Sequence, residues 1–267
     1  MSPSPEPEDR ARGMQAIPIR MLIPNAITMM ALAAGATGVR FAISGEYGKA
    51  AGAIVVAAVL DGIDGRVARL LRGTSRFGAE LDSLSDVTAF GIAPALILYL
   101  WALQDLGRIG WAVALALAIC CALRLARFNA AIDEADSPRK RLGFLTGVPA
   151  PAGAGIALTP LFLSLAFDDA LDQVPEVRGA IAGLVALLAA GLMVSTLPTW
   201  SAAAIKVSPA ARLPVLLLVG LFVAFLAQAP SATLAAVGAA YVASIPFAVV
   251  RYRKRLAESR ADDPQGD

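Results

Sequence analysis

The sequence predicts an all-α polytopic membrane bundle of about eight transmembrane helices, and three observations lead to this prediction. Hydrophobic residues make up 57% of the 267 residues and charged residues 16%, with a mean hydropathy of +0.66, which is too apolar for an ordinary soluble protein. Apolar runs recur at about the 20 residues that a helix needs to cross a bilayer. Basic residues gather in alternate loops between these runs, as in multi-pass proteins.

The apolar runs give the expected spans in chain order. They cover residues 24–44, 50–71, 82–103, 109–130, 149–167, 178–198, 211–228 and 231–250. Residues 1–20 are rich in proline and charge and lack the apolar core of a signal peptide, so they are expected to form a mobile cytoplasmic tail. Residues 258–267 are expected to form a second cytoplasmic tail.

The charges between the runs predict the orientation. Bases precede the first span, lie between the second and third and between the fourth and fifth, and follow the sixth and eighth: Arg10, Arg12, Arg20, Arg66, Arg69, Arg72, Arg76, Arg139, Lys140, Arg141, Lys206, Arg212, Arg251, Arg253, Lys254 and Arg255. By the positive-inside rule these loops and both termini are cytoplasmic, which predicts a multi-pass protein of the cell inner membrane. Topology accounts for most of the bases, so no nucleic-acid partner is expected.

Four aspartates interrupt the apolar pattern at one place. Asp61 and Asp64 stand three apart at the end of one apolar run, and Asp82 and Asp86 stand four apart near the start of the next. Either spacing puts a pair on one helix face. A carboxylate at bilayer depth costs from about 2.5 kcal/mol upward, so the four need compensating cations. Carboxylates suit Mg²⁺ or Mn²⁺, and two pairs on facing helices predict two ions in a site that opens to the cytoplasm.

Other residues near these aspartates favour phosphoryl chemistry. Gly65 and Gly78 remove side chains where a bulky ligand must approach the backbone, and Arg69 offers a fork for phosphate. The chain contains no histidine, which excludes Ser-His-Asp catalysis and histidine-bound zinc. A general base must therefore be Asp, Glu, Lys, Tyr or Cys.

The run DGIDGRVAR at residues 61–69, followed by Gly78, Asp82 and Asp86, resembles the signature of the CDP-alcohol phosphatidyltransferases. The resemblance implies a membrane enzyme with a six-helix core, here residues 21–210, followed by two additional helices in residues 211–257. It implies transfer of a substituted phosphate from a CDP-linked donor to an alcohol, with release of CMP. Two divalent cations would be held by Asp61, Asp64, Asp82 and Asp86, and Asp86 would also take the acceptor's proton. Contacts to CDP-diacylglycerol would come from Asn25, Thr28, Gly65, Ala68, Arg69, Ser75 and Gly78.

Further stretches bear on the acceptor alcohol. Residues 85–94, 124–129, 144–151 and 193–195, with Lys206, resemble the membrane-integral bacterial phosphatidylserine synthases, a branch of this family. That resemblance implies L-serine as acceptor. A zwitterion needs a cation for its carboxylate, which Arg124 and Arg127 on one helix face could supply, and a partner for its ammonium, for which Asn129 is a candidate. Lys206 is a further candidate contact.

Two alternatives remain open from the sequence. The same chemistry could use glycerol 3-phosphate, inositol phosphate or choline, although phosphorylated acceptors call for more bases than Arg124 and Arg127. A divalent-cation transporter is the alternative of another class, but it needs polar groups on both sides of the aspartates. The last two spans carry no chemical signal and are assigned either to a family extension or to a homodimer contact.

Overall fold

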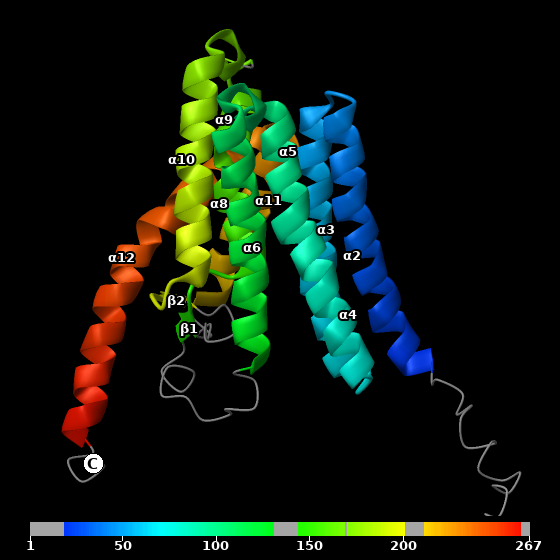
Figure 1. Ribbon diagram of the computed structural model, residues 1–267. Coiled ribbons are helices and arrows are strands. Elements are labelled where there is room, and N and C mark those ends of the chain that lie inside the picture. Colours follow the sequence, from blue (N-terminus) through cyan, green and yellow to red (C-terminus); the bar gives the residue numbers. More distant parts are fainter. Residues whose placement is uncertain (1–18, 131–143, 169, 201–210, 263–267) are drawn as a thin grey trace, which may run out of the picture.

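The computed structural model describes residues 19–130, 144–168, 170–200 and 211–262. Helices make up nearly all of this part, so the predicted all-α membrane bundle is confirmed. The helices run side by side along one direction (Figure 1), and the start of α2 and the end of α12 lie at the same end of the bundle. That end, drawn at the bottom of the figure, is called the lower end below.

The first half of the bundle contains the segments that carry the four aspartates. Its elements are α2 (Ile19–Ile43), α3 (Tyr47–Leu70), α4 (Arg76–Asp86), the π-helical turn η1 (Val87–Ile92), α5 (Ala93–Trp101), the 3-10 turn η2 (Leu103–Leu106) and α6 (Arg108–Ala130). Helix α2 packs along α3, and both contact the α4–η1–α5 segment. Asp61 and Asp64 therefore come from α3, and Asp82 and Asp86 from the neighbouring α4.

The second half packs against α6 and then turns outward. Its elements are β1 (Phe144–Thr146), α8 (Ala150–Ala157), α9 (Thr159–Ala166), the 3-10 turn η3 (Ala170–Gln173), α10 (Pro175–Val194), β2 (Pro198–Trp200), α11 (Arg212–Gln228) and α12 (Pro230–Asp262). The short strands β1 and β2 pair antiparallel, with Phe144 opposite Trp200. This pairing joins the start of α8 to the end of α10 and supports the lower part of α12.

Helices coincide with all eight predicted spans, but two spans are irregular. The span predicted at 149–167 is two helices of eight residues, α8 and α9, and Pro160 explains the break because its ring clashes with the carbonyl four residues earlier. The span predicted at 82–103 begins earlier, at Arg76, and changes to a π turn directly after Asp86. Pro94, just beyond that turn, cannot donate a hydrogen bond to Phe90, so the regular ladder cannot continue there.

Within the part of the chain that the structure describes, five helical segments are long and apolar enough to cross a membrane. They are Leu22–Ile43, Arg76–Trp101, Arg108–Ala130, Pro175–Val194 and Pro230–Glu258. The other three predicted spans correspond to α3, which carries the Asp61–Arg69 charges, to the broken α8–α9 pair and to the 17-residue α11. The protein is thus a multi-pass membrane protein, and the number of eight crossings stays a prediction.

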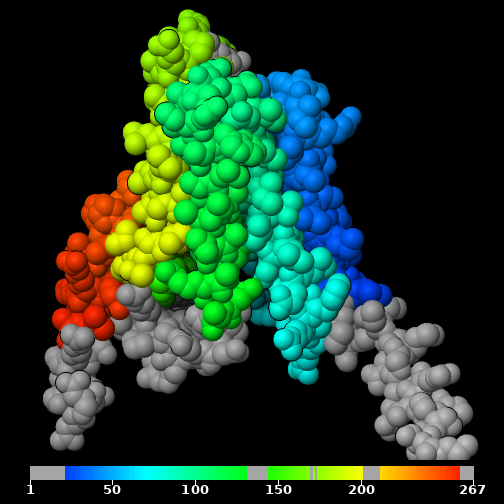
Figure 2. All heavy atoms as spheres, in the orientation of Figure 1, coloured from blue at the N-terminus to red at the C-terminus, as the bar shows by residue number. Residues whose placement is uncertain are grey.

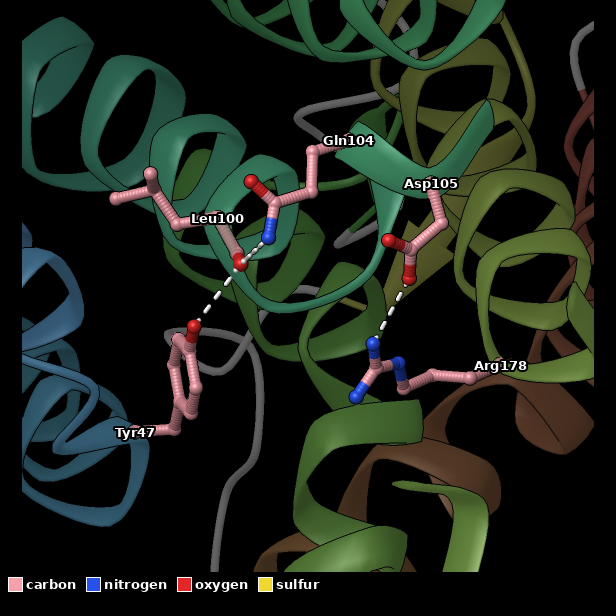
Figure 3. A network of polar contacts seen from close by, with 5 residues as sticks. All are labelled: Tyr47, Leu100, Gln104, Asp105 and Arg178. Carbon is pink, nitrogen blue, oxygen red and sulfur yellow. Dashed lines mark hydrogen bonds and ion pairs between the residues drawn. The ribbon is translucent and has the colours of Figure 1, made fainter. Parts of the chain in front are cut away.

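One hydrophobic core runs through the bundle. Its largest buried side chains include Trp101, Phe90, Leu98 and Leu103, surrounded by many alanines that let the helices approach closely. Polar contacts tie the upper ends together (Figure 3): Tyr47 Oη donates to Leu100 O at 2.9 Å, and Arg178 pairs with Asp105 at 2.8 Å. These contacts hold the helices at the end opposite to the aspartates.

Candidate active site

Three of the four aspartates converge as the sequence predicts. One carboxylate oxygen from each of Asp61, Asp64 and Asp82 lies within 4.8 Å of the others. Asp64 is buried and the other two are half-buried. Negative charges this close repel one another strongly in a poorly solvated place. The donor set is therefore one that a divalent cation would satisfy, and the residues fit such an ion by their chemistry as well as by their spacing.

Asp86 extends the cluster toward α6. Its carboxyl lies within hydrogen-bonding reach of Asp61, and it interacts electrostatically with Asp82 and with Arg124 of α6. Asp86 is the last residue of α4 and directly precedes the π turn. The π turn packs closely on α6 because Gly91 has no side chain; a Cβ at Gly91 would stand 3.0 Å from Cys121 Cβ. The local geometry thus brings Asp86 near a cation from a helix distant in the sequence.

Hydroxyl groups of α2 and α4 fix the position of Asp64. The Thr28 hydroxyl donates to Asp64 Oδ2 at 2.7 Å and also lies 3.1 Å from Pro24 O. Ser85 is buried and donates to Thr28 O at 3.1 Å. Thr28, expected from the sequence to contact the lipid donor, therefore also orients a carboxylate of the cluster. Ser85 was not among the predicted site residues, although it directly precedes Asp86 and begins the stretch 85–94 noted in the sequence.

A pocket of about 190 Å³ adjoins the cluster between α2, α3 and α4. It is lined by all seven residues predicted to bind CDP-diacylglycerol, together with two of the aspartates: Asn25, Thr28, Gly65, Ala68, Arg69, Ser75, Gly78, Asp64 and Asp82. The pocket therefore brings together the Arg69 guanidinium, amide and hydroxyl groups, and the two carboxylates. Such a set suits a phosphorylated ligand bound through metal ions.

Gly78 and Ser75 form the wall of this pocket at the start of α4. Ser75 is the N-cap of the helix, and its Oγ accepts a hydrogen bond from Gly78 N at 3.0 Å. A Cβ at Gly78 would stand 2.8 Å from Asn25 Oδ1 and 3.1 Å from Ser75 Oγ. The absence of a side chain at Gly78 thus lets Asn25 turn into the pocket.

Replacing Gly78 by alanine is expected to raise KM for the CDP-linked donor that the resemblance implies roughly tenfold, because the Asn25 amide must leave its place and a hydrogen bond is worth about 1 kcal/mol. Helix stability should not fall, since alanine favours a helix over glycine by up to about 1 kcal/mol. Donor titrations and thermal unfolding in detergent measure the two effects. The control is Gly52→Ala, where a Cβ on α3 meets nothing within 4 Å. Equal donor KM in both variants would contradict this account.

The structure describes three of the four residues suggested for serine binding and places them differently. Arg127 donates to Val194 O at 3.0 Å and to Ser195 O at 2.9 Å, so its guanidinium binds the carbonyl end of α10. Asn129 donates to Ser83 Oγ at 2.8 Å on α4. Lys206 lies outside the described residues. Arg124 alone of the described candidates interacts electrostatically with Asp61 and Asp86.

The chain resembles known enzymes along most of its length. The family model described as CDP-alcohol phosphatidyltransferase matches residues 21–197, and a second, described as CDP-alcohol phosphatidyltransferase 2, matches residues 210–246. A protein of Mycobacterium bovis called CDP-diacylglycerol–serine O-phosphatidyltransferase is 36% identical over 93% of this chain and 85% of its own. A protein of that name from Mycobacterium leprae is 34% identical over 95% of this chain and 83% of its own. One from Helicobacter pylori is 42% identical over 53% of this chain and 58% of its own. With its aspartate cluster and adjoining pocket, the chain belongs to the CDP-alcohol phosphatidyltransferase family.

Proposed function

We propose that this protein is a phosphatidylserine synthase, which transfers the phosphatidyl group of CDP-diacylglycerol to the hydroxyl of L-serine and releases CMP. The observation that carries the chemistry is the single pocket in which all seven expected donor contacts meet Asp64 and Asp82. The choice of serine is supported by relatives of that name, which match almost the whole chain at 34–36% identity. A cation transporter is disfavoured, because apolar core residues such as Phe90 and Leu98 fill the bundle above the cluster.

The donor occupies the α2–α3–α4 pocket in this proposal. Arg69 binds a phosphate oxygen, and Asn25 and Ser75 contact the nucleotide, while Gly65 and Gly78 leave room for it. Asp61, Asp64, Asp82 and Asp86 would hold two divalent cations, Mg²⁺ or Mn²⁺. When bound, such ions supply charge neutralisation for the donor's pyrophosphate and for the departing CMP.

The displacement itself needs one proton transfer. The serine oxygen forms a bond to the phosphatidyl phosphorus, the bond from that phosphorus to the CMP oxygen breaks, and the hydroxyl proton passes to Asp86. Asp86 suits this task because neither it nor Asp61 lines the nucleotide pocket; Asp86 lies on the side of the cluster that faces Arg124. The acceptor therefore approaches from the α6 side, opposite to the nucleotide, as a direct displacement requires.

A second pocket, of about 210 Å³, suits an acyl chain of the donor. It lies between α3, α8, α9 and α12 and is lined almost entirely by apolar groups, among them Ile54, Val55, Ala58 and Phe162. Ala58 stands one helical turn before Asp61, so the pocket adjoins the reacting centre. An apolar pocket at bilayer depth beside a site for a lipid headgroup fits a hydrocarbon chain.

Replacing Gly155 by leucine is expected to shift the preferred donor toward shorter acyl chains. Gly155 lines this second pocket, and a Cβ there meets nothing within 4 Å, so the larger side chain extends into the space without a clash at its base. The ratio of kcat/KM for short-chain over long-chain CDP-diacylglycerol should rise severalfold. Gly52→Leu is the control, because it adds the same side chain on the exposed face of α3. The same ratio in both variants would mean that the chain lies elsewhere.

The orientation and assembly are part of the proposal. The aspartates and both ends of the described chain lie toward the lower end, as do the predicted cytoplasmic bases around Arg72 and Arg253, so we assign this end to the cytoplasmic face of the inner membrane. Figure 2 shows the lower end of α4 standing apart from that of α6. Helix α11 buries none of its residues, so its apolar surface faces lipid or a second copy in a homodimer. Cross-linking in nanodiscs separates these two cases.

The test of the function is a purified-protein assay. CDP-diacylglycerol is supplied with L-serine, glycerol 3-phosphate, inositol phosphate, choline or ethanolamine, and CMP release is recorded with each acceptor. We expect dependence on a divalent cation and clear preference for serine, with phosphatidylserine identified as the product. A higher rate with another acceptor would overturn the serine assignment and leave the family chemistry intact.

A further inference from the structure

The acceptor side of the aspartate cluster contains a polar group from the last helix that the sequence did not reveal. Tyr241 of α12 lies at the edge of the apolar pocket and is close enough to Arg124 for electrostatic interaction. The two residues come from helices more than a hundred positions apart in the sequence. Arg124 also interacts with Asp61 and Asp86, and none of these four residues lines the pocket beside Asp64 and Asp82.

Both residues leave a buried polar atom unsatisfied. Arg124 Nε and Tyr241 Oη have no hydrogen-bond partner among the described residues. Tyr241 Oη lies near the Thr199 hydroxyl, but the two form no hydrogen bond of good geometry, and Thr199 Oγ1 donates its own proton to Gly147 O at 2.7 Å. Arg124 stacks near Phe128, with 5.9 Å from its guanidinium carbon to the ring centre, and forms no ion pair with the described residues.

A buried donor without a partner destabilises the fold, so native proteins keep few of them and each one calls for an explanation, such as a ligand that supplies the acceptor. A guanidinium and a phenol hydroxyl both donate hydrogen bonds, and together they suit an anionic group with several acceptor oxygens. Asp61 and Asp86, which lie nearby, suit a positive charge and a hydroxyl proton. The arrangement matches an amino acid, whose carboxylate, ammonium and hydroxyl groups carry these three properties.

We infer that Tyr241 and Arg124 together bind the carboxylate of the acceptor, so that the last transmembrane helix completes the acceptor site. This inference rests on the proposed function, because it takes serine as the acceptor. Tyr241 is a specificity-determining residue that positions the acceptor without taking part in bond making. The apolar ring of Tyr241 also forms part of the wall of the acyl-chain pocket, so the same side chain separates the polar acceptor from the lipid chain.

The experiment compares Tyr241→Phe with the parent enzyme in steady-state kinetics. Removing only the hydroxyl should raise KM for L-serine roughly 10- to 100-fold, since a hydrogen bond to a charged group is lost, while kcat and KM for CDP-diacylglycerol change less than about twofold. The control is Tyr47→Phe, which removes a half-buried hydroxyl that donates to Leu100 O at the upper end and should leave all three constants unchanged.

A double variant tests whether both residues act on the same group. If Tyr241 and Arg124 bind the same carboxylate of serine, their contributions are coupled. The fold increase in serine KM for the double variant Arg124→Lys, Tyr241→Phe should then be smaller than the product of the fold increases for the two single variants. An unchanged serine KM in Tyr241→Phe, or equal losses in both KM values and in thermal stability, would overturn the inference. CMP release by the parent enzyme is first measured with each acceptor, and a preference for another alcohol would refute the proposed function. If the parent prefers serine but Tyr241→Phe leaves the serine KM unchanged, only the role of Tyr241 is refuted.

Discussion

Single replacement of Asp61, Asp64 or Asp82 by asparagine is expected to lower CMP release on the order of a thousandfold. The three carboxylates lie within 4.8 Å of one another, so each would contribute a ligand to a divalent cation bound at the cluster. Charge stabilisation by a bound cation is worth several kcal/mol in phosphoryl transfer, and about 4 kcal/mol corresponds to a thousandfold in rate. Chelation of divalent ions from the parent enzyme should have an effect of the same size.

Asparagine retains the size of aspartate, so these variants should remain folded. Unfolding temperatures of the metal-free variants should be equal to or above that of the metal-free parent, because one of several clustered charges has been removed. Asp105→Asn is the matched control: it removes a carboxylate that pairs with Arg178 at the upper end, and activity should be retained. Near-normal activity in two of the three cluster variants would contradict the assignment of a metal centre.

The aspartate cluster and the adjoining pocket are the parts of the candidate site about which local sequence patterns say most. Their residues lie within short stretches of α2, α3 and α4, so helical spacing alone places Asp61 with Asp64 and Asp82 with Asp86 on common faces. Apolar length likewise located the helices, because the bilayer imposes that length on any spanning helix. How the three helices meet is set by their packing, and the seven donor contacts follow from it.

The acceptor side depended on contacts that no local pattern encodes. Arg124 and Arg127 stand three apart on one helix, yet Arg124 interacts with Asp61 and Asp86 while Arg127 binds the two carbonyl groups at the end of α10. The difference arises from which neighbour each side chain meets, and α10 begins nearly fifty residues later. Tyr241 was hidden for a similar reason, as a single tyrosine in an apolar span gives no sign of the helices around it.

The π turn after Asp86 illustrates a third kind of limit. Pro94 could have indicated an irregularity, but a proline in a transmembrane span can also produce a simple kink. The structure instead has a π turn at Val87–Ile92, packed on α6 through Gly91, and this turn directs the end of α4 toward Arg124. Irregular turns of this type occur frequently at functional sites.

Asp86→Asn is expected to separate proton transfer from donor binding. If Asp86 accepts the serine proton, kcat should fall about 10²- to 10⁴-fold, the usual contribution of a general base. Affinity for CDP-diacylglycerol should change little, because Asp61, Asp64 and Asp82 still hold at least one cation and the nucleotide pocket does not include Asp86. Asp82→Asn, one helical turn earlier on the same face, should instead weaken donor binding and turnover together, since Asp82 lines that pocket.

Donor binding is measured directly with CDP-diacylglycerol in detergent micelles, and turnover by CMP release at saturating serine. For each variant, the fold loss in kcat is divided by the fold loss in affinity for the donor. If Asp86 is the base, this quotient should be at least tenfold larger for Asp86→Asn than for Asp82→Asn. Equal quotients would show that Asp86 serves chiefly as a metal ligand. The proton would then have to pass to another group on the acceptor side, where Asp61 is the nearest carboxylate that interacts with both Asp86 and Arg124.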